Sequence, residues 1–416
     1  MTPRPSLADH DIEDLLREEA PQVLGALVRR FGRFDVAEDA VQEALLAAAQ
    51  QWPADGVPEN PRTWLIRIGY RRMVDVLRSE QARHRREVEV GTTEILRPRQ
   101  PTAPTDDSLT LLLLCCHPEL SDVSQVALTL RAVGGLTTAQ IAHAYGVTET
   151  TMGTRISRAK QTLIRTGARF TPPDDAERDV RLAAVRTVLY LIYNEGYTAS
   201  AGETLGRVDL ADEAIRLSRL LHHTSPDPES TALLALMLLT NSRRDARVDG
   251  AGADQQLVPL SEQDRSLWDR ELIAEGTALI DSVWGRGEPG PYQVQAAIAS
   301  VHAQAATPED TDWEQVAALY LVLEQHHPTG PVRLGRVVAV AHAFGAAEAL
   351  RALDELDREH GLENDALTAQ RTHAVRAHLL EMAGDVEAAR RSYAMAAELT
   401  RNDVERNYLV ERAGRL

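Results

Sequence analysis

The segment TTAQIAHAYGVTETTMGTRISRAK, residues 137–160, constrains the fold of this chain more than any other. Thr137 and Gln140 have the spacing of a capping box, which predicts the start of a helix. Gly146 supplies a tight turn, and a second helix is predicted over 148–165. Two helices joined in this way form a helix-turn-helix, whose second helix can enter the major groove of DNA. The alternative is an ordinary helical hairpin with a solvated basic face.

The composition favours an all-α protein of several domains. At 416 residues the chain exceeds one ordinary domain, and its 44% hydrophobic and 26% charged residues indicate a soluble globular protein. Aromatic residues make up only 4%, while alanine and leucine, which favour helix, are abundant. No apolar run is long enough to span a bilayer and the first residues do not resemble a signal peptide. We therefore expect a cytoplasmic protein without membrane contact.

Charge is divided unevenly along the chain. The net formal charge is −17, yet residues 1–170 carry 21 Arg and Lys against 22 Asp and Glu. The remaining residues carry 24 against 40, so nearly all of the acidity lies in the second part. Within the first part the cations cluster, with eight arginines in 62–86 and five cations without an acid in 155–169. Basic patches on a near-neutral module indicate nucleic-acid binding.

Two helices are predicted before the first basic cluster. Apolar residues at helical spacing predict one over 11–31, which Gly32 ends. A second is predicted over 35–52, where Asp35 and Glu38 have the spacing of a capping box. Residues 53–60 then form a loop.

A third helix is predicted from Pro61, with Asn60 as its N-cap. Three of its arginines recur at helical spacing and lie along one stripe: Arg67, Arg71 and Arg78. This stripe can contact DNA, and it can equally be a solvated face that pairs with the acids of the preceding helix. Aromatic rings among arginines suit stacking on unpaired bases. We expect Trp64 to lie in the core instead and leave the role of Tyr70 open.

The basic clusters belong to two predicted domains. Polar, proline-bearing sequence over 87–107 predicts a linker between them. A helix capped at Ser121 precedes the helix-turn-helix, and the segment TPPDD at 171–175 is the expected end of the second domain. We therefore predict domains over three ranges: 10–86, 108–170 and 176–416.

The last domain is predicted to be a large, helical, repeat-like array. The segment GDVEAARRSYAMAAEL at 384–399 has the small-residue and aromatic spacing of a tetratricopeptide helix. The segment GAAEALRALDEL at 345–356 resembles it, and the segment at 209–221 resembles it more weakly. Because the spacing is irregular, we expect stacked helices rather than a regular array.

No catalytic or metal site is expected. Cys115 and Cys116 are the only cysteines, and because they are adjacent they lack the spacing of a zinc site and are expected to be buried thiols. The chain has no phosphate-binding glycine loop, GxSxG elbow or HExxH motif. The histidine pairs at 222–223 and 326–327 are predicted to be exposed helix ends. We predict neither enzyme activity nor a cofactor.

Several stretches resemble extracytoplasmic-function sigma factors. AEDAVQEALLAAAQQW and the following NPRTWLIRIGYRRMVDVLR are similar to conserved region two of that family. SQVALTLRAVGGLTTAQIAHAYGVTETTMGTRISRAKQTL is similar to region four. The later segments VLYLIYNEGYTAS, LLALMLL, QDRSLWDRELIAEG and GPYQVQAAIASVHA are similar to the C-terminal, tetratricopeptide-like extension of one sigma class. The resemblance therefore spans nearly the whole chain.

The resemblance implies that the chain binds core RNA polymerase, at its clamp and flap regions, and directs initiation at promoter DNA. Region two would bind the clamp through one helix, with Asp35, Glu38, Asp39, Gln42 and Glu43. The melted −10 element would be held by Asn60, Arg62, Arg67, Tyr70, Arg71 and Arg78. The −35 duplex would be read by Thr148, Glu149, Thr151, Thr154, Arg155, Arg158 and Lys160. Gly153 departs slightly from the family pattern, and a bend there would change these contacts.

The role of the extension stays open. It either masks region two or four until a signal arrives, or it supports the sigma domains, and a protein or small-molecule regulator of it is conceivable. Within it, Asn194–Tyr197 is predicted to be a helix end with Gly196 as C-cap, with a docking contact as the alternative. The alternative function is a dimeric regulator that binds duplex operators without polymerase. A pure helical scaffold would leave the basic clusters unexplained.

Overall fold

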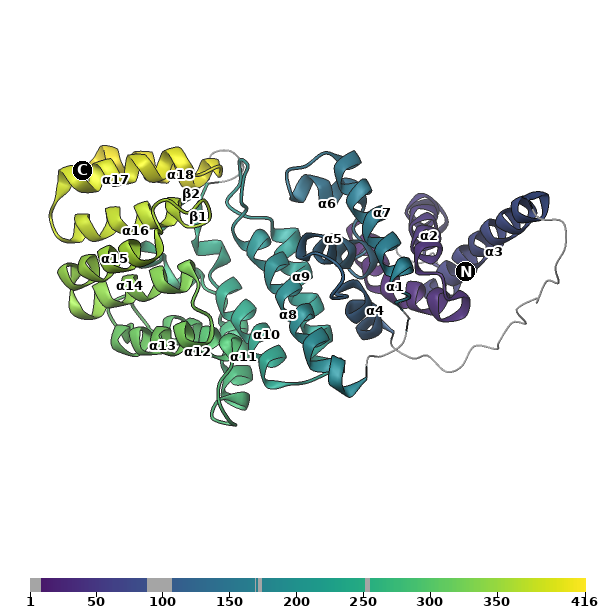
Figure 1. Ribbon diagram of the computed structural model, residues 1–416, viewed down its shortest axis with the longest axis horizontal. Coiled ribbons are helices and arrows are strands. Elements are labelled where there is room, and N and C mark those ends of the chain that lie inside the picture. Colours follow the sequence, from purple (N-terminus) through teal and green to yellow (C-terminus); the bar gives the residue numbers. More distant parts are fainter. Residues whose placement is uncertain (1–8, 88–106, 169, 171–173, 251–254) are drawn as a thin grey trace. The chain divides into compact units, whose positions relative to one another are not determined.

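The computed structural model describes residues 9–87, 107–168, 170, 174–250 and 255–416 (Figure 1). The chain divides into two compact units, Met1–Leu191 and Ile192–Leu416. Both are built from helices, and the described residues contain one short antiparallel pair of strands, β1 (Val248–Asp249) and β2 (Gln256–Leu257). The all-α fold class predicted from composition is confirmed. The predicted linker lies, apart from its two ends, outside the described residues.

The first helices of unit one form a three-helix bundle: α1 (Asp9–Phe31), α2 (Phe34–Asp55) and α3 (Pro61–Glu87). Its core includes the buried side chains of Leu27 and Leu65. Gly69 allows α3 to pack closely, because a Cβ there would lie 2.7 Å from Leu27 Cδ1. The predicted cap of α3 is confirmed, since Asn60 Oδ1 accepts a hydrogen bond from the Thr63 N–H at 3.0 Å.

The start of α2 differs from the prediction. Asp35 and Glu38 form no capping box, because the N-cap position is Arg33 and no side chain caps the helix. Both carboxylates have cationic partners instead: Arg33 Nη2 lies 3.0 Å from Asp35 Oδ2, and Arg131 Nε lies 2.7 Å from Glu38 Oε1. Helix α2 also continues beyond Trp52 to Asp55.

Four further helices follow in unit one: α4 (Ser108–Cys115), α5 (Asp122–Ala132), α6 (Thr138–Ala144) and α7 (Glu149–Arg165). The predicted capping box of α6 is confirmed, since the Gln140 N–H donates to Thr137 Oγ1 at 3.2 Å and the Thr137 N–H donates to Gln140 Oε1 at 2.8 Å. Gly146 has a φ of +58°, which glycine adopts without strain, in the turn that follows. Helices α6 and α7 therefore form the predicted helix-turn-helix. Ser121 precedes α5 as expected, but its side chain makes no capping hydrogen bond.

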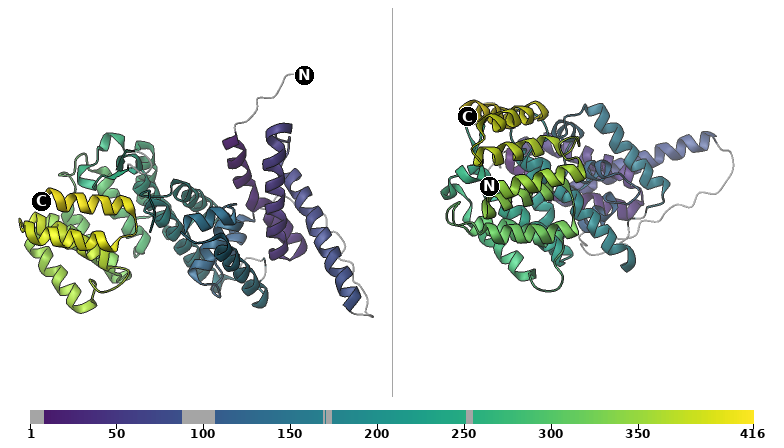
Figure 2. Two further views of the ribbon diagram at one scale, coloured as in Figure 1. Left: turned by 90° about the horizontal axis from the view of Figure 1, so that it is seen from above. Right: turned by 60° about the vertical axis from the view of Figure 1, so that its left-hand side comes forward.

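Helix α8 (Asp175–Tyr197) crosses the division between the units, and unit two continues with α9 (Val208–Thr224), α10 (Pro228–Asn241), α11 (Arg270–Val283), α12 (Pro291–Gln304), α13 (Trp313–His326), α14 (Gly330–Phe344), α15 (Ala346–His360), α16 (Ala369–Met382), α17 (Val386–Leu399) and α18 (Asp403–Arg415). The apolar helix α10 is central, because α9, α11 and α12 all pack on it. From α13 to α18 each helix packs on the next, as expected of a repeat-like array (Figure 2).

Gly196 is not the C-cap that the sequence predicted. Helix α8 continues through it to Tyr197, and its φ is not positive. A Cβ on Gly196 would lie 2.3 Å from the backbone nitrogen of Ala211, so glycine lets α8 approach the start of α9. The prediction that both histidine pairs are exposed helix ends is confirmed only in part. His326 is exposed, whereas His222 is half-buried with its Nδ1 3.0 Å from Thr231 Oγ1.

The end of the chain returns to the beginning of unit two. Asn402 is buried, and its Nδ2 donates to the carbonyl oxygens of Ala199 and Thr204 at 3.0 and 2.9 Å. Its Oδ1 caps α18 through the N–H groups of Val404 and Glu405. One amide side chain therefore joins segments about two hundred positions apart in sequence. Within the described residues, no helix is both long and apolar enough to cross a membrane.

Candidate nucleic-acid interface

One face of α7 presents the side chains expected to read duplex DNA. Thr148 caps the helix by accepting a hydrogen bond from the Thr151 N–H at 3.2 Å. The opposite face holds Met152 and Ile156 in the core. Most of the predicted −35 residues are exposed, namely Thr148, Glu149, Thr151, Thr154 and Arg158, and Arg155 is half-buried. Exposed hydroxyl and guanidinium groups on a second helix can bond base edges and phosphates.

Gly153 does not interrupt this helix. Helix α7 is continuous from Glu149 to Arg165 and ends in Arg165, a cation in the last turn. The space beside Gly153 is open, because the nearest atom to an added Cβ would be Thr138 Cγ2 at 3.8 Å. The predicted base-reading face is therefore preserved along the helix.

The arginine stripe of α3 is exposed and is not paired with α2. Within the described residues, Arg67, Arg71 and Arg78 form no ion pair. Arg72, outside the stripe, forms the pair with α2, and its Nη2 lies 2.9 Å from Glu43 Oε1. The alternative that the stripe is neutralised by the preceding helix is therefore wrong for these three residues.

Other residues of the predicted −10 surface have internal partners. Arg62 pairs with Glu19 of α1, with 2.6 Å between Nε and Oε2. Tyr70 is half-buried, with its ring centroid 5.4 Å from that of Phe31 and the Arg30 guanidinium 4.9 Å from its ring. Trp64 is half-buried and meets the Trp52 ring edge-on at 5.5 Å, so the expectation of a core role is supported.

The predicted polymerase-binding side chains of α2 fall into two groups. Asp39 is 71% exposed and Glu43 is exposed, so both are accessible. Glu38 is 1% exposed and lies between two cations that come from α5 and α7. Its Oε1 is 2.7 Å from Arg131 Nε, and its Oε2 pairs with Lys160 Nζ.

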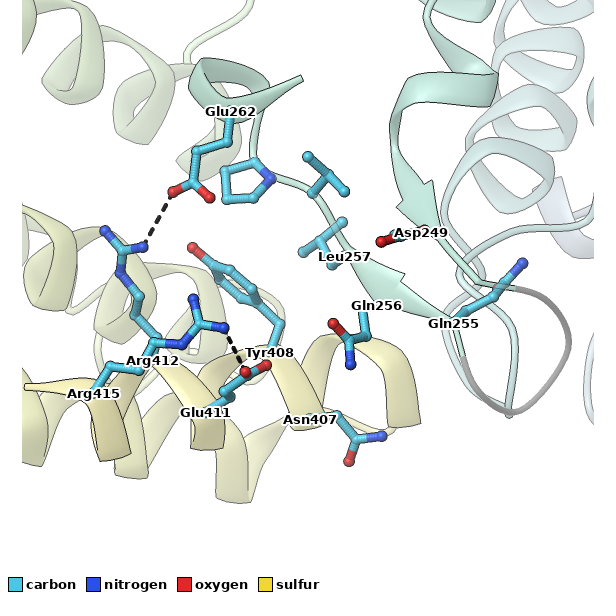
Figure 3. A pocket seen from close by; sticks show the side chains of 12 residues that line it. Asp249, Gln255, Gln256, Leu257, Glu262, Asn407, Tyr408, Glu411, Arg412 and Arg415 are labelled. Carbon is cyan, nitrogen blue, oxygen red and sulfur yellow. Dashed lines mark hydrogen bonds and ion pairs between the residues drawn. The ribbon is translucent and has the colours of Figure 1, made fainter. Parts of the chain in front are cut away.

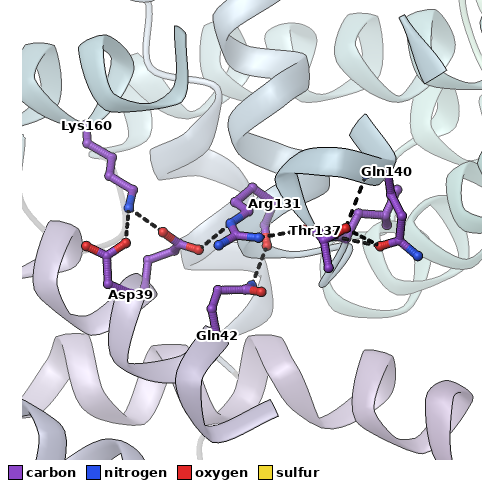
Figure 4. A network of polar contacts seen from close by, with 8 residues as sticks. Asp39, Gln42, Arg131, Thr137, Gln140 and Lys160 are labelled. Carbon is purple, nitrogen blue, oxygen red and sulfur yellow. Dashed lines mark hydrogen bonds and ion pairs between the residues drawn. The ribbon is translucent and has the colours of Figure 1, made fainter. Parts of the chain in front are cut away.

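Lys160 pairs with two of the acids of α2. Its Nζ pairs with Glu38 and lies 2.8 Å from Asp39 Oδ1 (Figure 4). Burial opposes the charged ammonium, but the two carboxylates outweigh it and raise the pKa of Lys160. The nearby Gln42 Nε2 donates to the carbonyl oxygen of Arg131 at 3.4 Å. The only lysine of the chain, predicted as a −35 contact, is therefore held against the predicted polymerase-binding helix.

A second contact joins the bundle of α1–α3 to the bundle formed by α4–α7. Arg29 of α1 forms an ion pair with Asp107, which precedes α4, and Gln22 Nε2 donates to Ser108 Oγ at 3.0 Å. Gly25 is required there, because a Cβ would lie 2.3 Å from Asp107 Cβ. The roles of Arg29 and Arg131 were missed from the sequence, since nothing in its local pattern brings either residue to its partner.

Both cysteines are buried in this unit, as predicted. Burial raises the pKa of Cys115, and raises that of Cys116 to about 12, so neither thiol is a ready nucleophile. Among the residues that could be searched, no cluster of three or more His, Cys, Asp or Glu side chains could hold a metal ion.

Family comparisons match the two parts of the chain that carry these surfaces. Residues 15–83 match Sigma-70 region 2, which contains α2 and α3. Residues 110–163 match Sigma-70, region 4, which contains the helix-turn-helix. The chain belongs to the sigma-70 family. It is an RNA polymerase sigma factor of the extracytoplasmic-function class with an additional C-terminal domain, and it directs promoter-specific transcription initiation.

Two relatives of this sigma factor cover different shares of the chain. It is 28% identical over 144 residues to the "ECF RNA polymerase sigma factor SigK" of Mycobacterium sp. (strain KMS), covering 32% of this chain and 72% of the relative. It is 41% identical over 402 residues to the "Uncharacterized protein R00370" of Rhizobium meliloti (strain 1021), covering 94% and 92%. Residues 181–284 match a family of unknown function, DUF6596. No solved structure matches.

The sigma factor's partners are core RNA polymerase and promoter DNA, as these matches imply. The matched sigma families are not enzyme families. The alternative of an operator-binding regulator that works without polymerase finds no support among the matches.

Proposed function

We propose that the two exposed cationic surfaces of unit one bind different parts of one promoter. The α3 stripe suits the melted −10 strand, because its three arginines are exposed and free of carboxylate partners within the described residues. The face of α7 suits the −35 duplex, because its threonines and Arg158 are exposed on a capped, continuous helix. The observation that carries the proposal is that two exposed basic faces lie on two different bundles, α1–α3 and α4–α7.

Promoter-directed transcription by the reconstituted holoenzyme tests these roles. Arg158→Ala should reduce transcription from a promoter with an intact −35 element by about tenfold, because a lost bidentate base contact costs ~1–3 kcal/mol. Arg351→Gln is the control, since this exposed arginine lies on α15 in unit two. Equal activity of Arg158→Ala and the control would contradict the proposed −35 role.

The acids of α2 are proposed to bind the polymerase clamp. The bundle of α4–α7 is proposed to bind the polymerase flap. Glu38 and Lys160 cannot serve these roles while they are buried and paired with each other. We infer that polymerase and DNA compete with this ion pair and that the two bundles separate when the holoenzyme forms. Asp39 is the accessible member, and it offers polymerase a first contact.

Hydrogen exchange of the full chain tests this opening. Lys160→Met removes the ammonium but keeps the length of the side chain, so α2 and α5 should exchange faster around Glu38, which keeps only Arg131 as a partner. Asp39→Asn is the matched control, because it changes the exposed partner alone. Unchanged protection of α2 in the Lys160→Met variant would show that the ion pair does not hold the bundles together.

The second unit is proposed either to mask the sigma surfaces or to support them. Truncation after Leu191 keeps unit one whole, including the hydrogen bond from Arg181 to the Leu113 carbonyl oxygen. Increased transcription by the truncated chain supports masking, and decreased transcription supports a supporting role. We place the protein in the cytoplasm, where core polymerase works.

A further inference from the structure

A groove in unit two is lined by residues from three successive helices. It lies between the end of α11, α12 and the beginning of α13, and its volume is about 440 Å³. That volume falls within the ~300–1,000 Å³ of ordinary ligand sites. Half of the twelve residues that line the groove are apolar, and three are aspartates. The groove is therefore large enough for one long side chain together with its backbone.

The three aspartates of the groove, Asp281, Asp310 and Asp312, have no cationic partner. None of them forms an ion pair within the described residues, and no described lysine, arginine or histidine lines the groove. Asp310 accepts hydrogen bonds from Thr307, and Asp312 accepts one from the Gln315 N–H as the N-cap of α13. Such local bonds orient the carboxylates and leave their negative charges in place.

The guanidinium group of Arg265 does not neutralise the groove. Arg265 is 7% exposed and donates to the carbonyl oxygens of His302 and Ala305. Burial lowers the pKa of Arg265 more than the charge of Asp310 raises it. In the part of the chain that the structure describes, no ion pair joins Arg265 to Asp310. The groove therefore keeps its negative charge.

The arrangement of the carboxylates favours an extended cation over a metal ion. Among the residues that could be searched, no three His, Cys, Asp or Glu side chains converge closely enough to hold a metal ion. Calcium, for example, needs several oxygen ligands at ~2.3–2.6 Å. A guanidinium group instead spreads its charge over five N–H donors in a planar fork, which can bond carboxylates and amide oxygens that lie apart.

Trp284 gives the groove an aromatic wall. This residue follows the last residue of α11 and is 42% exposed. A guanidinium plane can stack on an indole ring, and the aliphatic stem of an arginine can pack on apolar side chains such as Val301 and Leu319. A lysine ammonium is compact and more strongly hydrated, so it gains less from the ring. The combination of indole and carboxylates therefore favours arginine over lysine.

We propose that this groove binds an arginine side chain of a partner protein, presented on an exposed basic segment. Charge complementarity decides the choice of partner, because the groove has three unpaired carboxylates and no described cation in its lining. Residues 171–416 carry 24 Arg and Lys against 40 Asp and Glu, and this excess attracts basic segments to unit two. The inference does not depend on the sigma activity of unit one, because all of the lining residues lie in unit two.

A second cleft of unit two shows how arginines of the chain itself occupy such carboxylates. It lies between the β1–β2 hairpin and α18 and has a volume of about 400 Å³ (Figure 3). Arg412 Nη1 lies 3.1 Å from Glu262 Oε1, and Arg415 Nη2 lies 2.5 Å from Glu411 Oε1. Of its three acids, only Asp249 forms no ion pair within the described residues. An arginine from a partner should therefore prefer the groove of α11–α13.

Titration of the full chain with three short peptides tests the proposal. The peptides are blocked at both ends and differ only at a central position, which holds arginine, lysine or uncharged citrulline. In NMR spectra, the arginine peptide should shift the indole N–H signal of Trp284, which the Trp284→Leu variant assigns. It should bind about threefold more tightly than the lysine peptide, and the citrulline peptide should not saturate. Equal affinities of the two charged peptides, or an unmoved Trp284 signal, would overturn the proposal.

Variants locate the site. Asp281→Asn removes a carboxylate from an exposed position of α11, so it should weaken binding of the arginine peptide about fivefold without changing the Tm. Trp284→Leu keeps an apolar side chain but removes the ring, so the preference for arginine over lysine should be lost. Glu355→Gln is the matched control, because it removes the same charge from an exposed position of α15 outside the groove. An equal loss of binding in Asp281→Asn and Glu355→Gln would overturn the assignment.

Discussion

At the scale of single residues, two predictions from the sequence were wrong, one because of a close backbone approach and one because of a buried charge. Gly196 has the sequence context of a helix end, yet it lies within α8 because Ala211 approaches it from α9. Glu38 has the spacing of a capping residue, yet it pairs with Arg131 and Lys160. Both errors arise from partners distant in sequence, which local patterns cannot contain.

Gly196→Ala should destabilise unit two by more than 2 kcal/mol, on the order of a severe overpacking change. The added Cβ would lie 2.3 Å from a backbone nitrogen, which cannot move aside as a flexible side chain would. Urea unfolding followed by circular dichroism measures the change. Gly414→Ala is the matched control, because it lies in α18 with no atom within 4 Å of an added Cβ and should be neutral or slightly stabilising.

At the scale of elements, the helix-turn-helix was the most predictable part of the chain. Its capping box, turn glycine and second helix all depend on residues within four positions of one another, so the local sequence contains the necessary information. The arginine stripe of α3 was also predictable, because helical spacing alone aligns its members. The sequence could not predict that, in the described residues, this stripe forms no ion pair with the acids of α2, since that depends on how the bundle packs.

Gly153→Ala should stabilise α7. Alanine is favoured over glycine inside a helix by about 0.5–1 kcal/mol, and the space beside Gly153 is open. The Tm of the full chain should therefore rise while −35 recognition is retained. A lower Tm would mean that α7 depends on the flexibility of glycine at this position.

A histidine cluster in unit two should make its stability depend on pH. Burial, and then the nearby charges of Arg243 and Arg265, lower the pKa of His302 to about 4. The Trp313 ring lies between His302 and His342, and burial lowers the pKa of His342 as well. The unfolded chain binds protons more readily than the folded chain below pH ~6.5, so stability is complete above that pH and falls as the pH approaches 4.

The expected loss is about 2–3 kcal/mol for His302 across this range. Urea unfolding at pH 7.5, 6.0 and 5.0, conditions chosen around ~6.5, measures it. His302→Phe keeps a ring against Trp313 but cannot titrate, so its stability should vary less with pH. Identical pH profiles for the two proteins would rule out His302 as the source.

At the scale of the whole molecule, the distribution of charge explains how an acidic chain carries DNA-binding surfaces. Residues 1–170 are nearly balanced, with 21 Arg and Lys against 22 Asp and Glu, while the rest carry 24 against 40. The free sigma factor should therefore bind promoter DNA weakly, and the holoenzyme should bind it tightly. Gel-shift assays with and without core polymerase compare the two, and tight specific binding by the free chain would contradict this expectation.

The central claim is that this chain selects where core polymerase starts transcription. The most direct measurement is to add the purified protein to core polymerase on genomic DNA and to sequence the 5′ ends of the transcripts. The account predicts a new set of start sites that share −35 and −10 elements and that disappear without the protein. Start sites unchanged by its addition, or no association with core polymerase, would contradict it.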